Sequence, residues 1–148
     1  MALRNIVKLG DPILRKISRS VINFDDRLAM LLDDMKDTLK DACGAGLAAP
    51  QVGVLRRVCV VDVGDEDGVI ELVNPVITEE KGVQHEVEGC LSIPGESHVT
   101  ERPMWVKVRA QDRFGKTFTI EGEGLKARAF CHEIDHLNGI LYKDRLYK

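Results

Sequence analysis

The chain has 148 residues, of which 44% are hydrophobic and 30% are charged, with a formal net charge of -3 and a pI near 5.8. This length suits one domain with a single hydrophobic core, and the composition is that of a folded protein rather than a disordered one. The slightly acidic balance argues against nucleic acid as a partner, because binding to phosphates needs clustered Lys and Arg.

Neither a secretion signal nor a membrane segment is expected. The opening stretch MALRNIVKLGDPILRK lacks a long apolar run, and no later run reaches a membrane-spanning length. We therefore expect a cytoplasmic protein whose cysteines are free thiols. Cys43 and Cys59 are expected to pack in the core, and Cys131 is expected to be structural.

The first half of the chain predicts one helix followed by strands. Residues 25–42 place apolar side chains at steps of three and four, which predicts an amphipathic helix ending at Gly44. The next residues, 44–51, cannot continue that helix and are expected to form a loop or short strand. Short β-branched runs predict strands at residues 58–63, 70–77, 83–87 and 104–110.

The second half adds a hairpin and a final helix. A turn at residues 112–116 leads into alternation over residues 117–121, so antiparallel pairing is favoured. Residues 124–137 have helical character and stop at Asn138-Gly139. The sequence therefore predicts a single α+β domain over residues 1–148, with short antiparallel strands around a central C-terminal helix and an N-terminal amphipathic helix.

The final helix carries an HExxH pattern, HEIDH at residues 132–136. On a helical projection Leu125, Ala129, His132 and His136 share an arc of ~60°, so both imidazoles face the interior. Buried imidazoles need a partner, and a divalent metal ion supplies one. Glu133 lies beside the histidine stripe, where it can act as a general base without binding the ion.

A catalytic metal site commonly has a third protein ligand. The segment after His136 offers a single carboxylate, Asp144, so an upstream ligand is favoured. Cys90 follows Gly89, which allows a close backbone approach, and a thiolate binds a borderline-soft ion well. We nominate Cys90, and we expect Asp135 to pair with Arg102 rather than to bind the metal.

Three motifs in order resemble the peptide deformylase family: GAGLAAPQ at residues 44–51, EGCLS at residues 88–92 and HEIDH at residues 132–136. The opening GDPILR at residues 10–15 is similar too. Residue by residue, the resemblance implies Glu133 as the acid–base residue, the Gln51 side chain and the Leu91 backbone N–H as oxyanion donors, and as metal ligands Cys90, His132 and His136. It implies Fe²⁺ as the natural ion, with Zn²⁺, Ni²⁺ or Co²⁺ able to occupy such a site.

The resemblance also implies the reaction and its substrate. A hydrolase of this family removes the N-formyl group from the starting methionine of new proteins and releases formate, so its partners are N-formylmethionyl peptides. We expect Gly44, Gly46 and Gly89 to leave space for the formyl hydrogen but not for a larger acyl group. Leu125 and Ala129 are expected to line the pocket for the methionine side chain.

Two departures from the family pattern and three alternatives remain. Many relatives extend a C-terminal helix that docks on the ribosome, whereas this chain stops at Lys148, and GESH at residues 95–98 replaces a stretch where an arginine often grips the substrate backbone. The alternatives are an HExxH peptidase using Asp144 or another carboxylate, a structural zinc module with no use for Glu133, and an enzyme acting on another N-formyl amide.

Overall fold

The computed structural model describes residues 2–148. Its two helices are α1 (Asp26–Ala42) and α2 (Leu125–Leu137), and single 3₁₀ turns span Pro12–Arg15, Ala49–Val52 and Tyr142–Arg145. The strands are β1 (Gly46–Ala48), β2 (Val58–Val61), β3 (Ile70–Lys81), β4 (Gln84–Cys90), β5 (Ile93–Arg102), β6 (Trp105–Gln111) and β7 (Thr117–Glu123).

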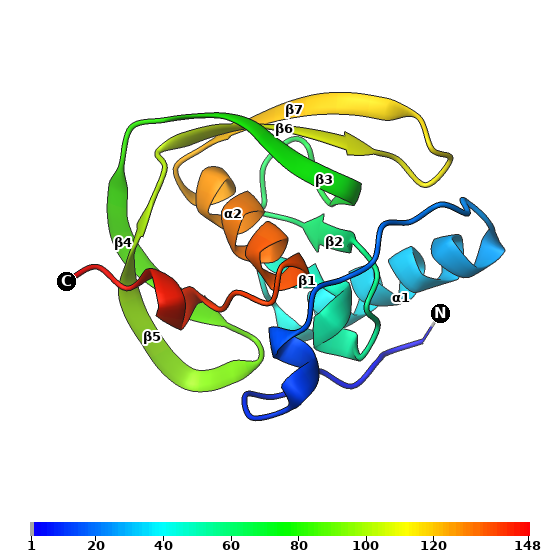
Figure 1. The fold of residues 1–148 in the computed structure, drawn as a ribbon, viewed down its shortest axis with the longest axis horizontal. Coiled ribbons are helices and arrows are strands. Elements are labelled where there is room, and N and C mark those ends of the chain that lie inside the picture. Colours follow the sequence, from blue (N-terminus) through cyan, green and yellow to red (C-terminus); the bar gives the residue numbers. More distant parts are fainter. Residues whose placement is uncertain (1) are drawn as a thin grey trace.

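The strands form two antiparallel sheets. One has five strands in the order β1-β2-β3-β6-β7, and the other is the β4–β5 hairpin. α2 runs through the centre of the molecule, enclosed by both sheets, with α1 to one side (Figure 1). The predicted α+β class, the antiparallel pairing and the central C-terminal helix are confirmed. Neither helix among residues 2–148 combines the length and apolarity needed to cross a bilayer.

Helix α1 begins and ends at identifiable caps. The side chain of Asp25 accepts a hydrogen bond from the Leu28 N–H at 3.1 Å, and the helix ends at Cys43, whose φ of 56° is left-handed. The cap lies one residue before the predicted stop. The expectation that Cys43 packs in the core is wrong, because the chain turns away from the helix there and leaves the thiol exposed.

The strand predictions missed β5 and underestimated β3 and β4. In β5 only Ile93, Thr100 and Arg102 are buried, so the strand lacks the apolar alternation by which half-buried strands are found. It exists because it pairs with β4 along most of its length. Residues 44–51, predicted as a loop or short strand, form β1 followed by a 3₁₀ turn.

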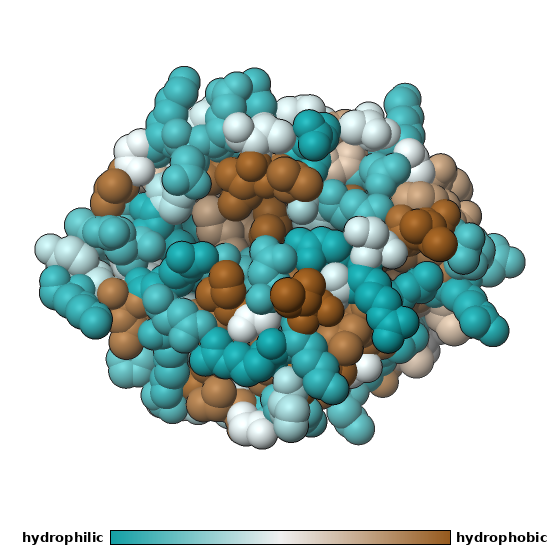
Figure 2. Space-filling model, in the orientation of Figure 1, coloured by the Kyte–Doolittle hydropathy of each residue, from teal (hydrophilic) through white to brown (hydrophobic). Residues whose placement is uncertain are grey.

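The core has two main parts. Apolar residues of α2 pack against β2, β3 and β6, with Phe130 and Leu137 fully buried, while α1 packs on the other side of β1 and β2. Cys59 is fully buried, as expected, and burial raises the pKa of the Cys131 thiol to about 12. The visible surface is a mosaic of hydrophilic side chains and small apolar patches (Figure 2).

Gly139, just after α2, is required for two reasons. Its φ is +72°, and a Cβ there would lie 2.5 Å from the backbone oxygen of Arg15. We expect Gly139→Ala to lower the free energy of unfolding by the left-handed backbone cost of ~1–2 kcal/mol plus a clash cost of ~1–3 kcal/mol. Gly64→Ala is the matched control, since its φ is +78° but nothing lies within 4 Å of the added Cβ. If urea unfolding showed the same loss of unfolding free energy in Gly139→Ala and Gly64→Ala, the predicted clash with Arg15 would be contradicted.

Candidate metal centre

Three potential metal ligands meet at the centre of the molecule. The Cys90 sulfur and the histidine nitrogens of His132 and His136 lie within 4.8 Å of one another, and this is the one such group among residues 2–148. The imidazoles stand one turn apart on α2, and Cys90 ends β4. The β4–β5 pairing is irregular between Gly89 and Cys90, a type of local irregularity that re-aims a side chain.

The spacing of these atoms fits a tetrahedral ion. The two Nε2 atoms lie 3.2 Å apart, and Cys90 Sγ lies 3.4 Å from His136 Nε2. With bonds of ~2.05 Å to nitrogen and ~2.3 Å to sulfur, tetrahedral geometry puts two nitrogens ~3.3 Å apart and sulfur and nitrogen ~3.6 Å apart. These two distances match a tetrahedral ion, and the third pair, Cys90 and His132, also lies within the 4.8 Å of the cluster, so the residues present fit a divalent ion. Asp144 lies outside the group and bonds Arg15 at 2.5 Å and the Leu141 N–H at 3.1 Å.

Glu88 supports this centre, and the sequence reasoning missed it. Its Oε2 lies 2.6 Å from His132 Nδ1, the ring nitrogen turned away from the cluster. A carboxylate in this position fixes the orientation of a ligating imidazole. Burial raises the pKa of Glu88, but hydrogen bonds from His132 and Arg102 outweigh it and lower the pKa to about 2. Strand alternation, which places Glu88 and Cys90 on one face, was the available signal.

Arg102 links the two ligand-bearing elements. Its Nη2 and Nε bond the two oxygens of Glu88 at 2.7 and 3.1 Å, and its Nη1 bonds Asp135 at 2.6 Å. The predicted pairing of Asp135 with Arg102 is confirmed. The Arg102 side chain is 3% exposed, so the two buried carboxylates share one buried cation. Asp135 also contacts Arg145, which is 44% exposed.

Glu133 stands beside the ligands without joining them. Its Oε2 lies 3.9 Å from His132 Nε2, and its buried Oε1 has no hydrogen-bond partner in the described structure. Burial raises the pKa of Glu133 to about 7. Gly46 makes room for it, because a Cβ at Gly46 would lie 2.5 Å from Glu133 Oε2.

Gln51 approaches the centre from the 3₁₀ turn after β1. Its Oε1 accepts from the Ala48 N–H at 3.0 Å, which fixes the amide. Its Nε2 donates to Ser92 Oγ at 3.1 Å and lies 3.6 Å from Cys90 Sγ. One N–H of the buried amide is therefore directed at the metal cluster.

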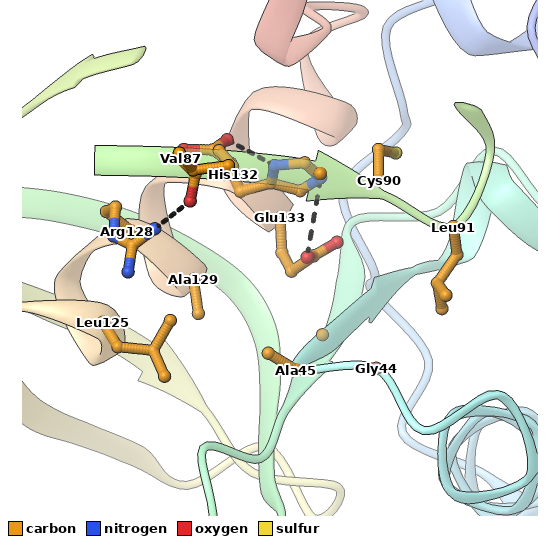
Figure 3. A pocket seen from close by; sticks show the side chains of 13 residues that line it. Gly44, Ala45, Val87, Cys90, Leu91, Leu125, Arg128, Ala129, His132 and Glu133 are labelled. Atoms are coloured by element: carbon orange, nitrogen blue, oxygen red, sulfur yellow. Dashed lines mark hydrogen bonds and ion pairs between the residues drawn. The ribbon is translucent and has the colours of Figure 1, made fainter. Parts of the chain in front are cut away.

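A cavity of about 310 Å³ opens beside the centre (Figure 3). All five residues expected to bind substrate line it, together with Leu91. Gly44 faces the Leu91 side chain, 2.9 Å from where a Cβ would be, whereas a Cβ at Gly89 would meet only the Glu96 oxygen at 3.5 Å. Gly44 and Gly46 thus accommodate neighbouring side chains rather than leaving empty space. The full lining is Gly44, Ala45, Gly46, Val87, Glu88, Gly89, Cys90, Leu91, Leu125, Arg128, Ala129, His132 and Glu133.

Comparisons with known proteins agree on one family. The family model described as polypeptide deformylase matches residues 3–148. A peptide deformylase of Caldicellulosiruptor bescii is 58% identical over 148 residues, covering 100% of this chain and 88% of that protein. One of Alkaliphilus metalliredigens is 57% identical, covering 100% and 99%.

Solved structures agree in fold as well as sequence. The crystal structure of a peptide deformylase from Thermotoga maritima is 41% identical with a TM-score of 0.95, covering 99% of each chain. That from Legionella pneumophila is 49% identical with a TM-score of 0.94, covering 98% of this chain and 86% of that one.

Replacing Arg102 should expose the cost of the buried carboxylates. We expect Arg102→Leu to lower the free energy of unfolding by about 3–5 kcal/mol, because Glu88 and Asp135 lose their common cation. Arg145→Leu is the matched control: it also removes a partner of Asp135, but an exposed one, and should cost about 1 kcal/mol or less. Similar urea midpoints for Arg102→Leu and Arg145→Leu would contradict the claim that Arg102 is the cation that stabilises the two buried carboxylates.

Cys90 is expected to be necessary for metal binding. Cys90→Ser should weaken binding of Co²⁺ more than ~10-fold and abolish the thiolate-to-cobalt absorption band, since a hard hydroxyl replaces a soft ligand. Cys43→Ser is the control, because Cys43 is an exposed thiol outside the cluster. An unchanged cobalt spectrum in Cys90→Ser would exclude the thiol as a ligand.

Proposed function

This chain belongs to the polypeptide deformylase family, and from that premise we propose how its own residues carry out the reaction. The enzyme is a metal-dependent hydrolase that removes the N-formyl group from the N-terminal methionine of newly synthesised proteins. The meeting of Cys90, His132 and His136, with Glu133 beside them, is the observation that carries the proposal. In it, residues 1–148 act as one catalytic domain.

We propose that Cys90, His132 and His136 bind one divalent ion, Fe²⁺ in the cell, with Zn²⁺, Ni²⁺ or Co²⁺ able to replace it. One thiolate and two imidazoles favour these ions over Mg²⁺ or Ca²⁺, which prefer oxygen ligands. When bound, the ion supplies Lewis acidity that lowers the pKa of a water molecule and polarises the formyl carbonyl.

Glu133 moves the proton in this proposal. Its buried Oε1 has no other partner among the described residues, so it is free to accept a proton from the attacking water. The same carboxyl then donates that proton to the leaving amine nitrogen. Gly46 lets the Glu133 carboxylate lie close to His132, since any larger residue would have to displace that carboxylate.

Gln51 and the Leu91 backbone N–H are proposed to stabilise the negative charge that develops on the formyl oxygen. The Gln51 amide is held by Ala48 and Ser92 before substrate arrives, so it needs no reorganisation during the reaction. Each donor of this kind contributes roughly 10²–10³ in rate.

The cavity is proposed to hold the methionine side chain against Leu125 and Ala129, with Gly44, Gly46 and Gly89 along the substrate path. The substrates are formylated nascent chains, so we propose that the enzyme acts in the cytoplasm, where they are made. We propose no ribosome association for these residues. A peptidase has little support because Asp144 is engaged by Arg15, and a closed structural zinc site would need a fourth ligand that residues 2–148 do not bring to the cluster.

Glu133→Gln tests the proton-transfer role. We expect formate release from formyl-Met-Ala-Ser by the anaerobic, iron-loaded enzyme to fall by ~10²-fold or more, because the amide cannot accept a proton. Metal content and the unfolding midpoint should stay near wild type. Wild-type turnover in Glu133→Gln would refute the assignment.

A companion variant moves Glu133 without removing it. Gly46→Ala places a Cβ 2.5 Å from Glu133 Oε2, which is too close, so the carboxylate must shift. Turnover should therefore fall, although the carboxylate, the ligands and the metal content remain. Full activity in Gly46→Ala would show that the position of the carboxylate is not critical.

A further inference from the structure

The cavity beside the metal centre has two walls. One is the face of α2 that carries Leu125, Arg128, Ala129 and His132 at helical steps of three and four. The other is the end of β4, residues 87–90. Its width therefore depends on what holds α2 against β4.

Apart from the Cys90–His136 contact within the metal cluster, two side-chain contacts join the walls. The inner contact is His132 Nδ1 with Glu88 Oε2 at 2.6 Å, within the metal network. The outer contact is Arg128, whose Nη1 donates to the Val87 carbonyl oxygen at 2.7 Å. Arg128 and Val87 lie together at the end of the cavity away from Cys90 (Figure 3).

Arg128 is held there by the backbone and not by charge pairing. It is half-buried, it is the single cation lining the cavity, and it forms no ion pair among residues 2–148. Its buried Nε has no hydrogen-bond partner in the described structure. The hydrogen bond to the Val87 carbonyl oxygen lies in a solvent-exposed setting, and it is the one that the Arg128 side chain forms within residues 2–148.

Distances along the elements suggest what Arg128 does. Val87 precedes Cys90 by three residues of strand, or roughly 10 Å. An extended substrate places the terminal methyl of a methionine side chain roughly 8 Å from its formyl carbon. On these lengths a methionine side chain ends before the Arg128–Val87 contact and does not pass it.

We propose that Arg128 is a specificity-determining residue that closes the far end of the side-chain cavity and limits the length of the first side chain of the substrate. The proposal rests on the proposed function of the site. A linear side chain longer than methionine must displace the guanidinium and break its bond to Val87, whereas methionine need not.

The test is a length series of N-formyl peptides beginning with methionine, norleucine or 2-aminooctanoic acid. Norleucine matches methionine in length, and 2-aminooctanoic acid adds two methylenes. We expect wild type to favour norleucine over 2-aminooctanoic acid in kcat/KM by ~10-fold or more, the discrimination typical of a methylene or two in a closed pocket. Arg128→Ala should reduce that ratio by ~10-fold.

Two further variants separate the causes. Arg128→Met keeps a long side chain but cannot donate to Val87, and it should also reduce the ratio. Lys126→Ala is the matched control, because Lys126 lies on the same helix but pairs with Asp65 and Asp67 away from the cavity, and it should keep the wild-type ratio.

The outcomes are distinguishable. A wild-type ratio in Arg128→Ala would overturn the proposal, and a wild-type ratio in Arg128→Met would overturn closure through the Val87 bond. A reduced norleucine to 2-aminooctanoic acid ratio in Lys126→Ala would also overturn the proposal, because loss of any positive charge from α2 would then have the same effect as loss of Arg128. If the wild-type enzyme released formate from none of the three peptides, the proposed function would be overturned, and this proposal with it.

Discussion

The guanidinium of Arg102 joins the two elements that carry the candidate metal ligands. It binds Glu88 on β4 and Asp135 on α2 from one buried position. Cys90 lies two residues after Glu88, and His136 follows Asp135 directly, so Arg102 contributes to the distance from thiol to imidazole together with the direct contact of His132 with Glu88. Two buried carboxylates are costly without a cation between them, so loss of Arg102 destabilises this arrangement even though Arg145 and His132 also contact the carboxylates.

Much of the fold was predictable because local patterns and tertiary structure agree. Helix α1 has an apolar stripe and a capping aspartate, and it starts within one residue of the prediction. Helix α2 was predicted over residues 124–137 with both imidazoles facing the interior, and its buried residues lie both toward the sheet and toward Cys90. β5 was not predictable in this way, since pairing with β4 rather than apolar burial makes it a strand.

The residues of the candidate site also fall into those that local sequence patterns predicted and those that only tertiary contacts reveal. The spacing of the histidines in HEIDH and the position of Cys90 led to the three residues that the structure brings together. Strand alternation could have indicated Glu88 as a neighbour of Cys90, but the contacts of Glu88 and Arg128 join residues 44 and 41 positions apart, and helix or strand spacing does not reveal such partners. The glycines were predicted to leave space for the formyl hydrogen, but the space at Gly46 is occupied by Glu133, which only coordinates show.

The three proposed metal donors come from β4 and α2, and only the folded chain presents them together. An ion that binds the native chain and not the unfolded one shifts the folding equilibrium by mass action, by ~2.7 kcal/mol when its free concentration is 100 times its Kd. Unfolded molecules are continuously degraded by cellular proteases. Scarcity of the metal would therefore shorten the lifetime of the protein itself, and cellular metal supply would set the abundance of the enzyme in addition to the rate of each molecule.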